Sequence, residues 1–215
     1  MVTSFSEMVY VFDLDDTLYS EFDFVKSGMR HVMNELQNRG IKDILKYKEL
    51  LSNSKDWIDR LLLNPAVAAL GKGELLALYR NHFPEIQCYP DAFKFLTRLK
   101  TEGTLIALIT DGRSSTQRNK IKALGLDHFF DVVVISEEIG SEKPNSANYL
   151  PIQVKWPGNS YCYFGDNVRK DFIGPKKLGW KTVGLRDRGC NIHTQLVSMT
   201  DLHQPESWIT NFDDY

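Results

Sequence analysis

Three aspartates, Asp13, Asp15 and Asp16, follow directly on the apolar run 9–12. A short run of β-branched and aromatic residues is typical of a strand that is buried on both faces. Asp13 and Asp15 are two positions apart, so in an extended backbone their side chains begin on the same face. Two carboxylates this close repel each other unless one is protonated or a cation lies nearby. A hard divalent cation such as Mg²⁺, which prefers oxygen ligands, fits this pair.

Polar residues follow later apolar runs in the same way. Three runs carry a polar residue at or soon after their ends: 105–109 with Thr110, 131–135 with Lys143, and 161–164 with Asp166. In a parallel α/β sheet the carboxyl ends of the strands lie along one edge, where ligands bind. We therefore expect these residues to converge with Asp13. Carboxylates, a hydroxyl group and a lysine are together able to hold a metal ion and a phosphate.

The second part of the chain alternates between strand and helix patterns. The expected strands are 9–12, 105–109, 131–135, 161–164 and 181–186, and the expected helices between them are 91–101, 115–124, 145–153 and the end of 169–178. This alternation predicts right-handed βαβ units and an α/β fold with a parallel sheet of about five strands. In the tail we expect a short edge strand over 196–202 and a helical turn over 206–212.

The stretch 19–89 has a different pattern, because its apolar residues recur at helical spacing with no period of two. The expected helices are 22–36, 42–51, 57–62 and 74–82. We therefore expect an all-helical domain over 19–89, inserted after the first strand, and an α/β domain made of 1–18 and 90–215. The inserted part, residues 19–89, is called the helical block below.

The composition excludes several classes of protein. Among 215 residues, 26 are Lys or Arg and 28 are Asp or Glu, which gives a net charge of −2. That balance offers no electrostatic reason to bind nucleic acid or an anionic membrane. Residues 1–7 lack the pattern of a signal peptide, and no apolar run approaches the ~20 residues that span a bilayer. Three widely spaced cysteines predict reduced thiols in a cytoplasmic protein. The sequence does not indicate an oligomeric state.

Four motifs in this order resemble those of one known family. They are Asp13-Leu14-Asp15-Asp16-Thr17, Thr110, Lys143-Pro144 and Gly165-Asp166-Asn167-Val168-Arg169-Lys170-Asp171. The chain resembles the haloacid dehalogenase superfamily, in its Mg²⁺-dependent phosphatase branch, over residues 8–185. The resemblance implies a Rossmann-like core, and the helical block resembles the cap domain that many members insert between the first two motifs.

The resemblance also implies roles for the acids. Asp13 would be the nucleophile that forms an aspartyl-phosphate. Asp15 would donate a proton to the leaving oxygen and later accept one from water. Mg²⁺ would be held by the carboxylates of Asp13 and Asp166 and by the backbone carbonyl of Asp15.

The remaining motif residues would bind or organise the phosphate. Thr110 would hold a phosphate oxygen through its hydroxyl, together with neighbouring backbone N–H groups such as that of Asp111. Lys143 would neutralise charge on the transferring group. Asp171 would orient Lys143 or a metal-bound water. Asp16 is expected to cap the following turn, while Arg169 and Lys170 are expected on the solvated surface.

The implied function is hydrolysis of a small phosphomonoester, a sugar phosphate or a nucleotide, because a closing cap would obstruct a folded protein. Candidate cap contacts with the substrate are Lys26, Arg30 and Lys72. Other readings stay open: a phosphomutase, a phosphonate hydrolase that uses Lys26 or Lys72 as a Schiff base, and a catalytically idle binding protein. A 2-haloacid dehalogenase is disfavoured, because it needs no metal and leaves Asp15 without a purpose.

Overall fold

The computed structural model describes residues 8–51, 56–189 and 200–215. Its centre is a parallel sheet in the order β3-β2-β1-β4-β5-β6. The strands are β1 (Met8–Phe12), β2 (Leu105–Thr110), β3 (Val132–Ile135), β4 (Ser160–Gly165), β5 (Lys181–Leu185) and β6 (Ser207–Ile209). β1 lies between β2 and β4, with Val11 opposite both Ala107 and Tyr163. The predicted α/β class and parallel sheet are confirmed, with six strands where about five were expected.

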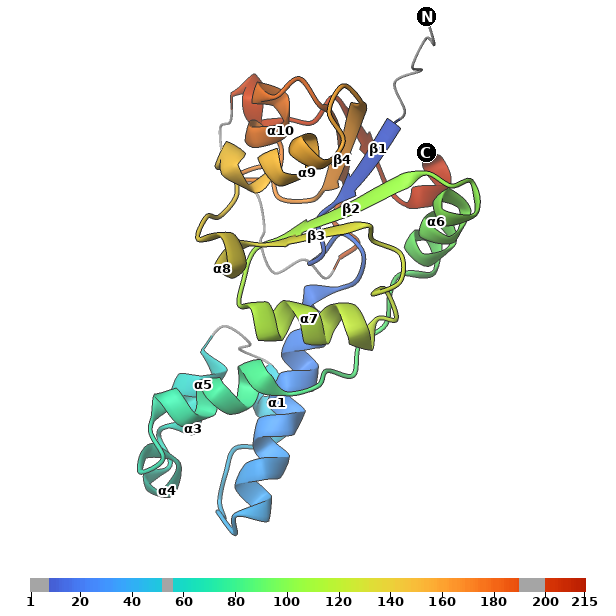
Figure 1. The fold of residues 1–215 in the computed structure, drawn as a ribbon. Helices are drawn as coiled ribbons and strands as arrows, with labels where there is room; N and C mark the ends of the chain where they lie inside the picture. The colour runs from blue at the N-terminus through green and yellow to red at the C-terminus, as the bar shows by residue number, and fades with distance from the viewer. Residues whose placement is uncertain (1–7, 52–55, 190–199) are drawn as a thin grey trace, which may run out of the picture.

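The two faces of the sheet are covered by different helices, as Figure 1 shows. Phe12 and Leu108 point to the face covered by α6 (Pro90–Thr101) and α7 (Ser114–Ala123). Val11 and Tyr163 point to the other face, near α9 (Leu150–Lys155) and α10 (Ile173–Lys177). Because successive strand residues alternate between faces, near-continuous apolar runs are what burial on both sides requires.

The last part of the chain differs from the prediction. β6 pairs with β5, with Trp208 opposite Gly184, where a helical turn was expected. The predicted edge strand over 196–202 falls partly outside the described residues, and Leu202 belongs to a short 3-10 helix, η2 (Asp201–His203). The pairing of Ser207–Ile209 depends on the open edge of β5, which the local pattern of the tail does not reveal.

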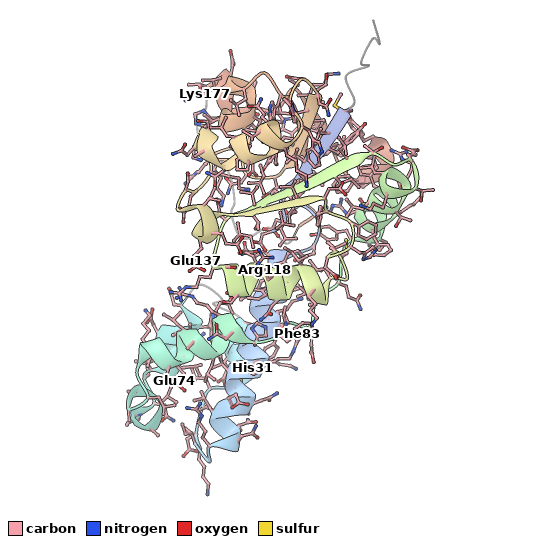
Figure 2. All side chains as sticks on the ribbon, viewed as in Figure 1. His31, Glu74, Phe83, Arg118, Glu137 and Lys177 are labelled. Carbon is pink, nitrogen blue, oxygen red and sulfur yellow. The ribbon has the colours of Figure 1, made fainter. Side chains whose placement is uncertain are left out.

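The helical block forms a second cluster of helices: α1 (Glu21–Asn38), α2 (Tyr47–Leu51), α3 (Trp57–Leu61), α4 (Pro65–Ala68) and α5 (Lys72–Asn81). Met29, Val32 and Leu36 of α1 lie on one helical face and pack with Trp57 and Leu75 in a core of the block's own. His31 and Glu74 lie in this block, whereas Arg118 and Glu137 lie on the sheet side, as Figure 2 shows. The helix predicted over 42–51 is shorter, since only its second half is helical.

The block contacts the sheet part at its connecting segments and along α7. The two segments that connect the block to the sheet part, one entering and one leaving it, run side by side. The backbone N–H of Tyr89 in the second donates to the carbonyl of Leu18 in the first at 2.8 Å. The hydroxyl of Thr116 on α7 donates to the carbonyl of Arg80 on α5 at 3.0 Å. We propose these crossing segments as the domain boundaries, near residues 18 and 89.

Three smaller expectations concern other parts of the chain. The predicted helix 145–153 is split into a 3-10 helix, η1 (Ser146–Asn148), and α9, which has Pro151 in its first turn. Cys88 and Cys162 are free thiols, and Cys190 lies outside the described residues. None of the helices in the described ranges combines the length and the apolar character that crossing a bilayer requires.

Candidate functional site

The carboxyl ends of the three central strands bring the predicted polar residues together. Asp13 follows β1, Thr110 ends β2, and Asp166 follows β4, and these strands are neighbours in the sheet. The backbone N–H of Asp13 donates to the carbonyl of Phe164 at 2.9 Å, which extends the β1–β4 ladder to Asp13. The site therefore lies where ligands bind in open α/β sheets.

A buried lysine links two of the acids. The ammonium of Lys143 contacts an oxygen of Asp13, lies 2.7 Å from Oδ1 of Asp171, and donates to the hydroxyl of Tyr163 at 3.2 Å. The side chains of Lys143 and Asp171 are 1% and 0% exposed. Burial would lower the pKa of Lys143, but Asp13 and Asp171 outweigh it and hold that pKa well above its usual range. Burial raises the pKa of Asp13 to about 7, against the lowering effect of Lys143.

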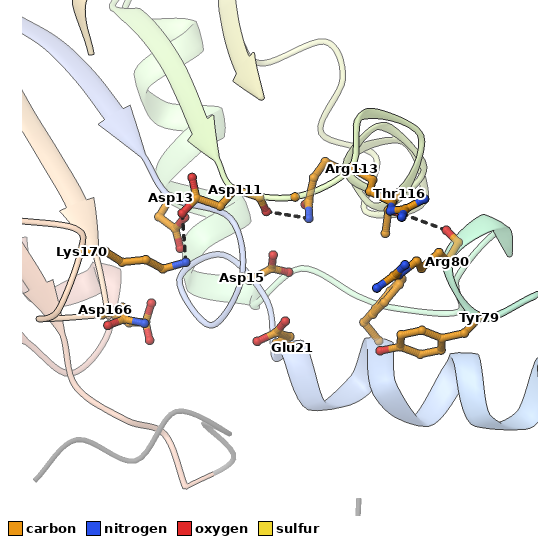
Figure 3. Close-up of a pocket in the computed structure, with 14 residues that line it drawn as sticks. Asp13, Asp15, Glu21, Tyr79, Arg80, Asp111, Arg113, Thr116, Asp166 and Lys170 are labelled. Atoms are coloured by element: carbon orange, nitrogen blue, oxygen red, sulfur yellow. Dashed lines mark hydrogen bonds and ion pairs between the residues drawn. The ribbon is translucent and has the colours of Figure 1, made fainter. Parts of the chain in front are cut away.

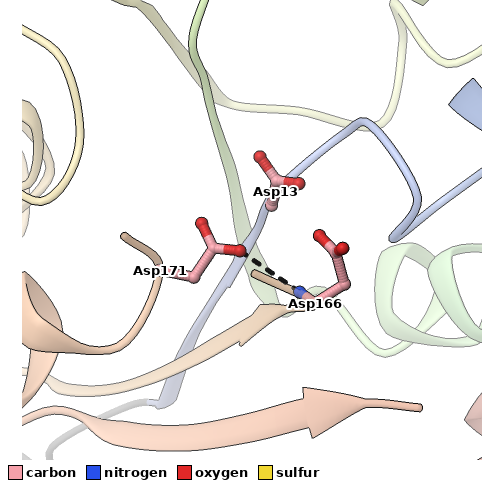
Figure 4. A group of neighbouring side chains, drawn as sticks. All are labelled: Asp13, Asp166 and Asp171. Carbon is pink, nitrogen blue, oxygen red and sulfur yellow. Dashed lines mark hydrogen bonds between the residues drawn. The ribbon is translucent and has the colours of Figure 1, made fainter. Parts of the chain in front are cut away.

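Asp171 organises the loop after β4. Its Oδ1 accepts from Lys143 and Tyr163, and its Oδ2 accepts from the backbone N–H groups of Asp166 at 3.2 Å and Asn167 at 2.8 Å. A Cβ at Gly165 would lie 2.7 Å from Oδ2 of Asp171, so the close approach of this carboxylate requires glycine there. Figure 4 shows Asp171 beside Asp166 and Asp13.

Asp13, Asp166 and Asp171 form an acid cluster in which one carboxylate oxygen from each residue lies within 4.8 Å of those of the other two. Within the described ranges it is the one group of acids, histidines and cysteines close enough to hold a metal ion. Asp171 is 0% exposed and accepts hydrogen bonds from four groups, whereas Asp13 and Asp166 are each 6% exposed, so Asp13 and Asp166 are the ligands that fit a cation. Carboxylate oxygens are the ligands that Mg²⁺ prefers. The chemistry of the donor set therefore fits a hard divalent ion.

Asp15 has two partners that sequence reasoning missed. The ammonium of Lys120 lies 2.7 Å from Oδ1 of Asp15, and the hydroxyl of Tyr19 donates to the same oxygen. Burial would raise the pKa of Asp15, but the charge of Lys120 and these hydrogen bonds outweigh it and lower that pKa. The sequence did contain a signal for Lys120. In the predicted helix 115–124 it shares a face with Thr116, four positions earlier, and it is next to the apolar Ile121, which indicates that it lies near the buried side of the helix.

A cavity of about 300 Å³ opens over this edge of the sheet, between the helical block and the core. Its lining residues are Asp13, Asp15, Glu21, Phe24, Tyr79, Arg80, Asp111, Gly112, Arg113, Thr116, Gln117, Asp166, Asn167 and Lys170. Figure 3 shows Asp13, Asp111, Asp166 and Lys170 at one end and Tyr79 and Arg80 at the other, with Asp15 and Glu21 between them. The predicted acids thus share one cavity with residues of the block.

Some predicted phosphate ligands lie behind this lining. Thr110 is 1% exposed, and its hydroxyl donates to the side-chain carbonyl of Gln117 at 3.2 Å. Lys143 is paired with Asp13 and is not among the residues that line the cavity. Asp111 lines the cavity, and its Oδ1 accepts from the backbone N–H of Lys143 at 3.1 Å. Thr17, which was not assigned a role, donates its hydroxyl to Oδ2 of Asp13 at 3.2 Å.

Lys26, Arg30 and Lys72, the candidate cap contacts, do not line this cavity, and their contact with a substrate stays a prediction. They pair with acids on the surface of the block, at 2.5 Å to Asp23, 3.4 Å to Glu85 and 2.5 Å to Asp59. Each of these long side chains pairs with an acid of its own block. Asp23 and Lys26 lie three positions apart on α1, whereas the other two pairs join residues that are distant in the sequence.

Expectations for three further residues have different outcomes. Lys170, expected on the solvated surface, lines the cavity and lies 3.1 Å from Oδ2 of Asp111. Arg169 is exposed, as expected. Oδ1 of Asp16 accepts from the backbone N–H of Glu21, the first residue of α1, at 2.8 Å.

Comparison with known proteins gives matches over most of the chain. A family model described as haloacid dehalogenase-like hydrolase matches residues 10–185. The glyceraldehyde 3-phosphate phosphatase of Methanopyrus kandleri is 30% identical, with 82% of each chain covered. That of Methanocaldococcus jannaschii is 32% identical, over 81% of this chain and 83% of its own. The HAD-hydrolase YfnB of Bacillus subtilis, bound to magnesium, has a similar fold with a TM-score of 0.68 at 17% identity, covering 98% of this chain and 97% of its own.

Proposed function

Because the chain belongs to the haloacid dehalogenase-like hydrolase family, we propose that it is a Mg²⁺-dependent phosphatase of small phosphorylated metabolites. The observation that carries this proposal is the buried cluster of Asp13, Asp166 and Asp171 at the end of the central strands, where Lys143 pairs with Asp13 and Asp171. Buried acids are costly unless they are paired or bind a cation, so their position favours a chemical role.

The first step is attack by Asp13 on the phosphorus of the substrate. An oxygen of Asp13 forms a bond to phosphorus, the bond from phosphorus to the substrate oxygen breaks, and Asp15 supplies the proton that the leaving oxygen takes up. Lys143 and the hydroxyl of Thr17 contact Asp13 and restrict its rotation. Held in this way, the carboxylate keeps one orientation towards the cavity.

The second step returns the enzyme to its starting state. A water molecule loses a proton to Asp15, its oxygen bonds to phosphorus, and the bond from phosphorus to Asp13 breaks. Asp13 and Asp166 would hold Mg²⁺, with the backbone carbonyl of Asp15 as a further ligand. When bound, Mg²⁺ offsets the repulsion between an anionic nucleophile and an anionic substrate.

The cavity supports a small substrate. Its volume of about 300 Å³ suits a metabolite and not a folded protein. We propose a short phosphorylated sugar or sugar-like compound, since the relatives named above are glyceraldehyde 3-phosphate phosphatases. The phosphonate hydrolase reading has no support from the block, because Lys26 and Lys72 are paired with acids outside the cavity.

The test is release of phosphate from p-nitrophenyl phosphate and from glyceraldehyde 3-phosphate, with Mg²⁺ and with EDTA. We expect turnover that EDTA abolishes, and a fall of about 10³-fold or more in kcat for Asp13→Asn, because the nucleophile is lost. Asp127→Asn, which changes an exposed aspartate, is the matched control and is expected to keep wild-type activity.

Two outcomes would contradict the proposal. Turnover that survives EDTA or Asp13→Asn would rule out this mechanism. Binding of Mg²⁺ without turnover of any phosphate ester would favour a catalytically idle binding protein.

A further inference from the structure

The carboxylate of Asp15 is held by one of its two oxygens. Lys120 lies 2.7 Å from Oδ1, and the hydroxyl of Tyr19 donates to that same oxygen. Among the described residues, no hydrogen bond to Oδ2 of Asp15 is present, and Asp15 lines the catalytic cavity. Two donors on one oxygen restrict rotation of the carboxylate and leave the other oxygen available to a molecule in the cavity.

Lys120 is itself fixed in place. Its side chain is 3% exposed, and its ammonium lies 4.3 Å from the ring centroid of Phe24 and 5.9 Å from that of Tyr19. Phe24 lies on α1 of the helical block, whereas Lys120 lies on α7 of the core. Burial of an ammonium is unfavourable unless it is paired, and here the ion pair with Asp15 offsets the desolvation of Lys120. The lysine therefore has a single defined position against Asp15.

We propose that Lys120 is a positioning residue that directs Oδ2 of Asp15 towards the water that hydrolyses phosphorylated Asp13. This inference rests on the proposed function. In this step an O–H bond of water breaks and its proton goes to Oδ2 of Asp15. The water oxygen bonds to phosphorus, and the bond between phosphorus and the Asp13 oxygen breaks, with its electron pair returning to Asp13. Without Lys120, Tyr19 is the one donor on Oδ1 among the described residues, and the carboxylate rotates more freely.

The substrate p-nitrophenyl phosphate separates the two steps. Its leaving group is stable as an anion and needs no proton from Asp15, so phosphorylation of Asp13 depends little on how Asp15 is oriented. Hydrolysis of the phosphorylated enzyme still requires Asp15 to accept a proton from water. A defect in positioning Asp15 therefore slows the second step selectively with this substrate.

The experiment is rapid mixing of Lys120→Met with p-nitrophenyl phosphate and Mg²⁺. We expect a burst of p-nitrophenolate whose rate constant stays within about threefold of the wild-type phosphorylation rate. The steady-state kcat should fall about 30- to 100-fold, since a misplaced proton acceptor costs this much. KM should fall with kcat, because the phosphorylated enzyme accumulates. Lys122→Met on the same helix, at an exposed position, is the matched control and should behave as wild type.

A double mutant identifies the residue through which Lys120 acts. In an Asp15→Asn background, Lys120→Met should change the steady-state kcat by less than about twofold, because the target of positioning is gone. Tyr19→Phe removes the other donor to Oδ1 and should produce a burst with a smaller loss of steady-state rate. This variant keeps the inference testable if Lys120→Met does not fold, which thermal unfolding would reveal.

The outcomes distinguish this inference from the proposed function. If the wild-type protein shows Mg²⁺-dependent turnover, but Lys120→Met lowers kcat without a burst or lowers it equally in the Asp15→Asn background, the inference is wrong and the proposed function stands. If the wild-type protein turns over no phosphate ester, both are wrong.

Discussion

The charged residues of the sheet edge and those of the helical block lie in opposite environments. At the sheet edge, Lys143 is 1% exposed and is shared between Asp13 and Asp171. On the block, the pair of Lys72 and Asp59 is 53% and 59% exposed. A buried charge depends strongly on its partners, whereas an exposed ion pair is screened by water and contributes about 0–1 kcal/mol. Chemistry that needs fixed charges can therefore be built at the sheet edge and not on the outer surface of the block.

The block still shapes the site, but with other residues than its surface lysines. Phe24, Tyr79 and Arg80 line the cavity from the side that faces the strand ends. Figure 3 shows Tyr79 and Arg80 across the cavity from Asp13 and Asp166. We infer a division of roles, in which the core performs the reaction and the inner face of the block contacts the substrate.

The largest expected effect concerns the stability of the two charge clusters. Lys143→Met leaves Asp13 and Asp171 buried without their cation and should lower the free energy of unfolding by about 3–5 kcal/mol. Lys72→Met removes an exposed pair and should lower it by less than about 1 kcal/mol. Urea unfolding at neutral pH, followed by circular dichroism, measures both. Similar losses of unfolding free energy for the two variants would mean that the buried pairs and the exposed pair contribute equally to stability.

A smaller effect concerns substrate binding. Arg80→Ala should raise KM for a phosphorylated sugar about five- to tenfold with little change in kcat, because a guanidinium that faces the cavity binds the substrate in both the ground and transition states. Lys26→Ala should leave KM within about twofold, since Lys26 is paired with Asp23 outside the cavity. Steady-state kinetics at saturating Mg²⁺ measures both. A larger rise in KM for Lys26→Ala would mean that the outer surface of the block also contacts the substrate.

The smallest effect concerns the pH dependence of folding in the block. His82 follows α5, and its ring nitrogens lie 2.6 Å from the carbonyl of Tyr79 and 3.1 Å from the hydroxyl of Ser27. Burial lowers the pKa of His82 more than the bond to Tyr79 raises it. Below pH of about 6.5 the unfolded chain therefore binds a proton that the native state does not, so the free energy of unfolding falls until the lower native pKa is reached.

Urea unfolding between neutral and mildly acidic pH tests this sign. The wild-type free energy of unfolding should fall more steeply on acidification than that of His82→Gln. His128→Gln, at an exposed position, is the control and should keep the wild-type slope. A steeper fall in His82→Gln than in the wild-type protein would contradict the direction of the pKa shift.

The core could be predicted to a large extent because its signals are local. The central strands β1, β2 and β4 are short, largely apolar runs, and Asp13 and Asp166 stand directly at the ends of two of them, so the convergence of these acids follows from parallel order alone. The tail was predicted less well. Ser207–Ile209 is a strand because it pairs with the edge of β5, and a three-residue segment carries no periodicity that would indicate this pairing.

The sequence by itself determined the α/β fold, the helical insertion and the identity of the acids around Asp13, because spacing and motif order are properties of neighbouring residues. The tertiary structure decided which charges meet. Lys120 pairs with Asp15 across 105 positions, and Lys170 reaches Asp111 across 59. Lys72 instead pairs with Asp59 of its own block, across 13 positions. A long side chain can reach any acid within several ångströms of its backbone, so its partner is settled only when the helices and strands have packed.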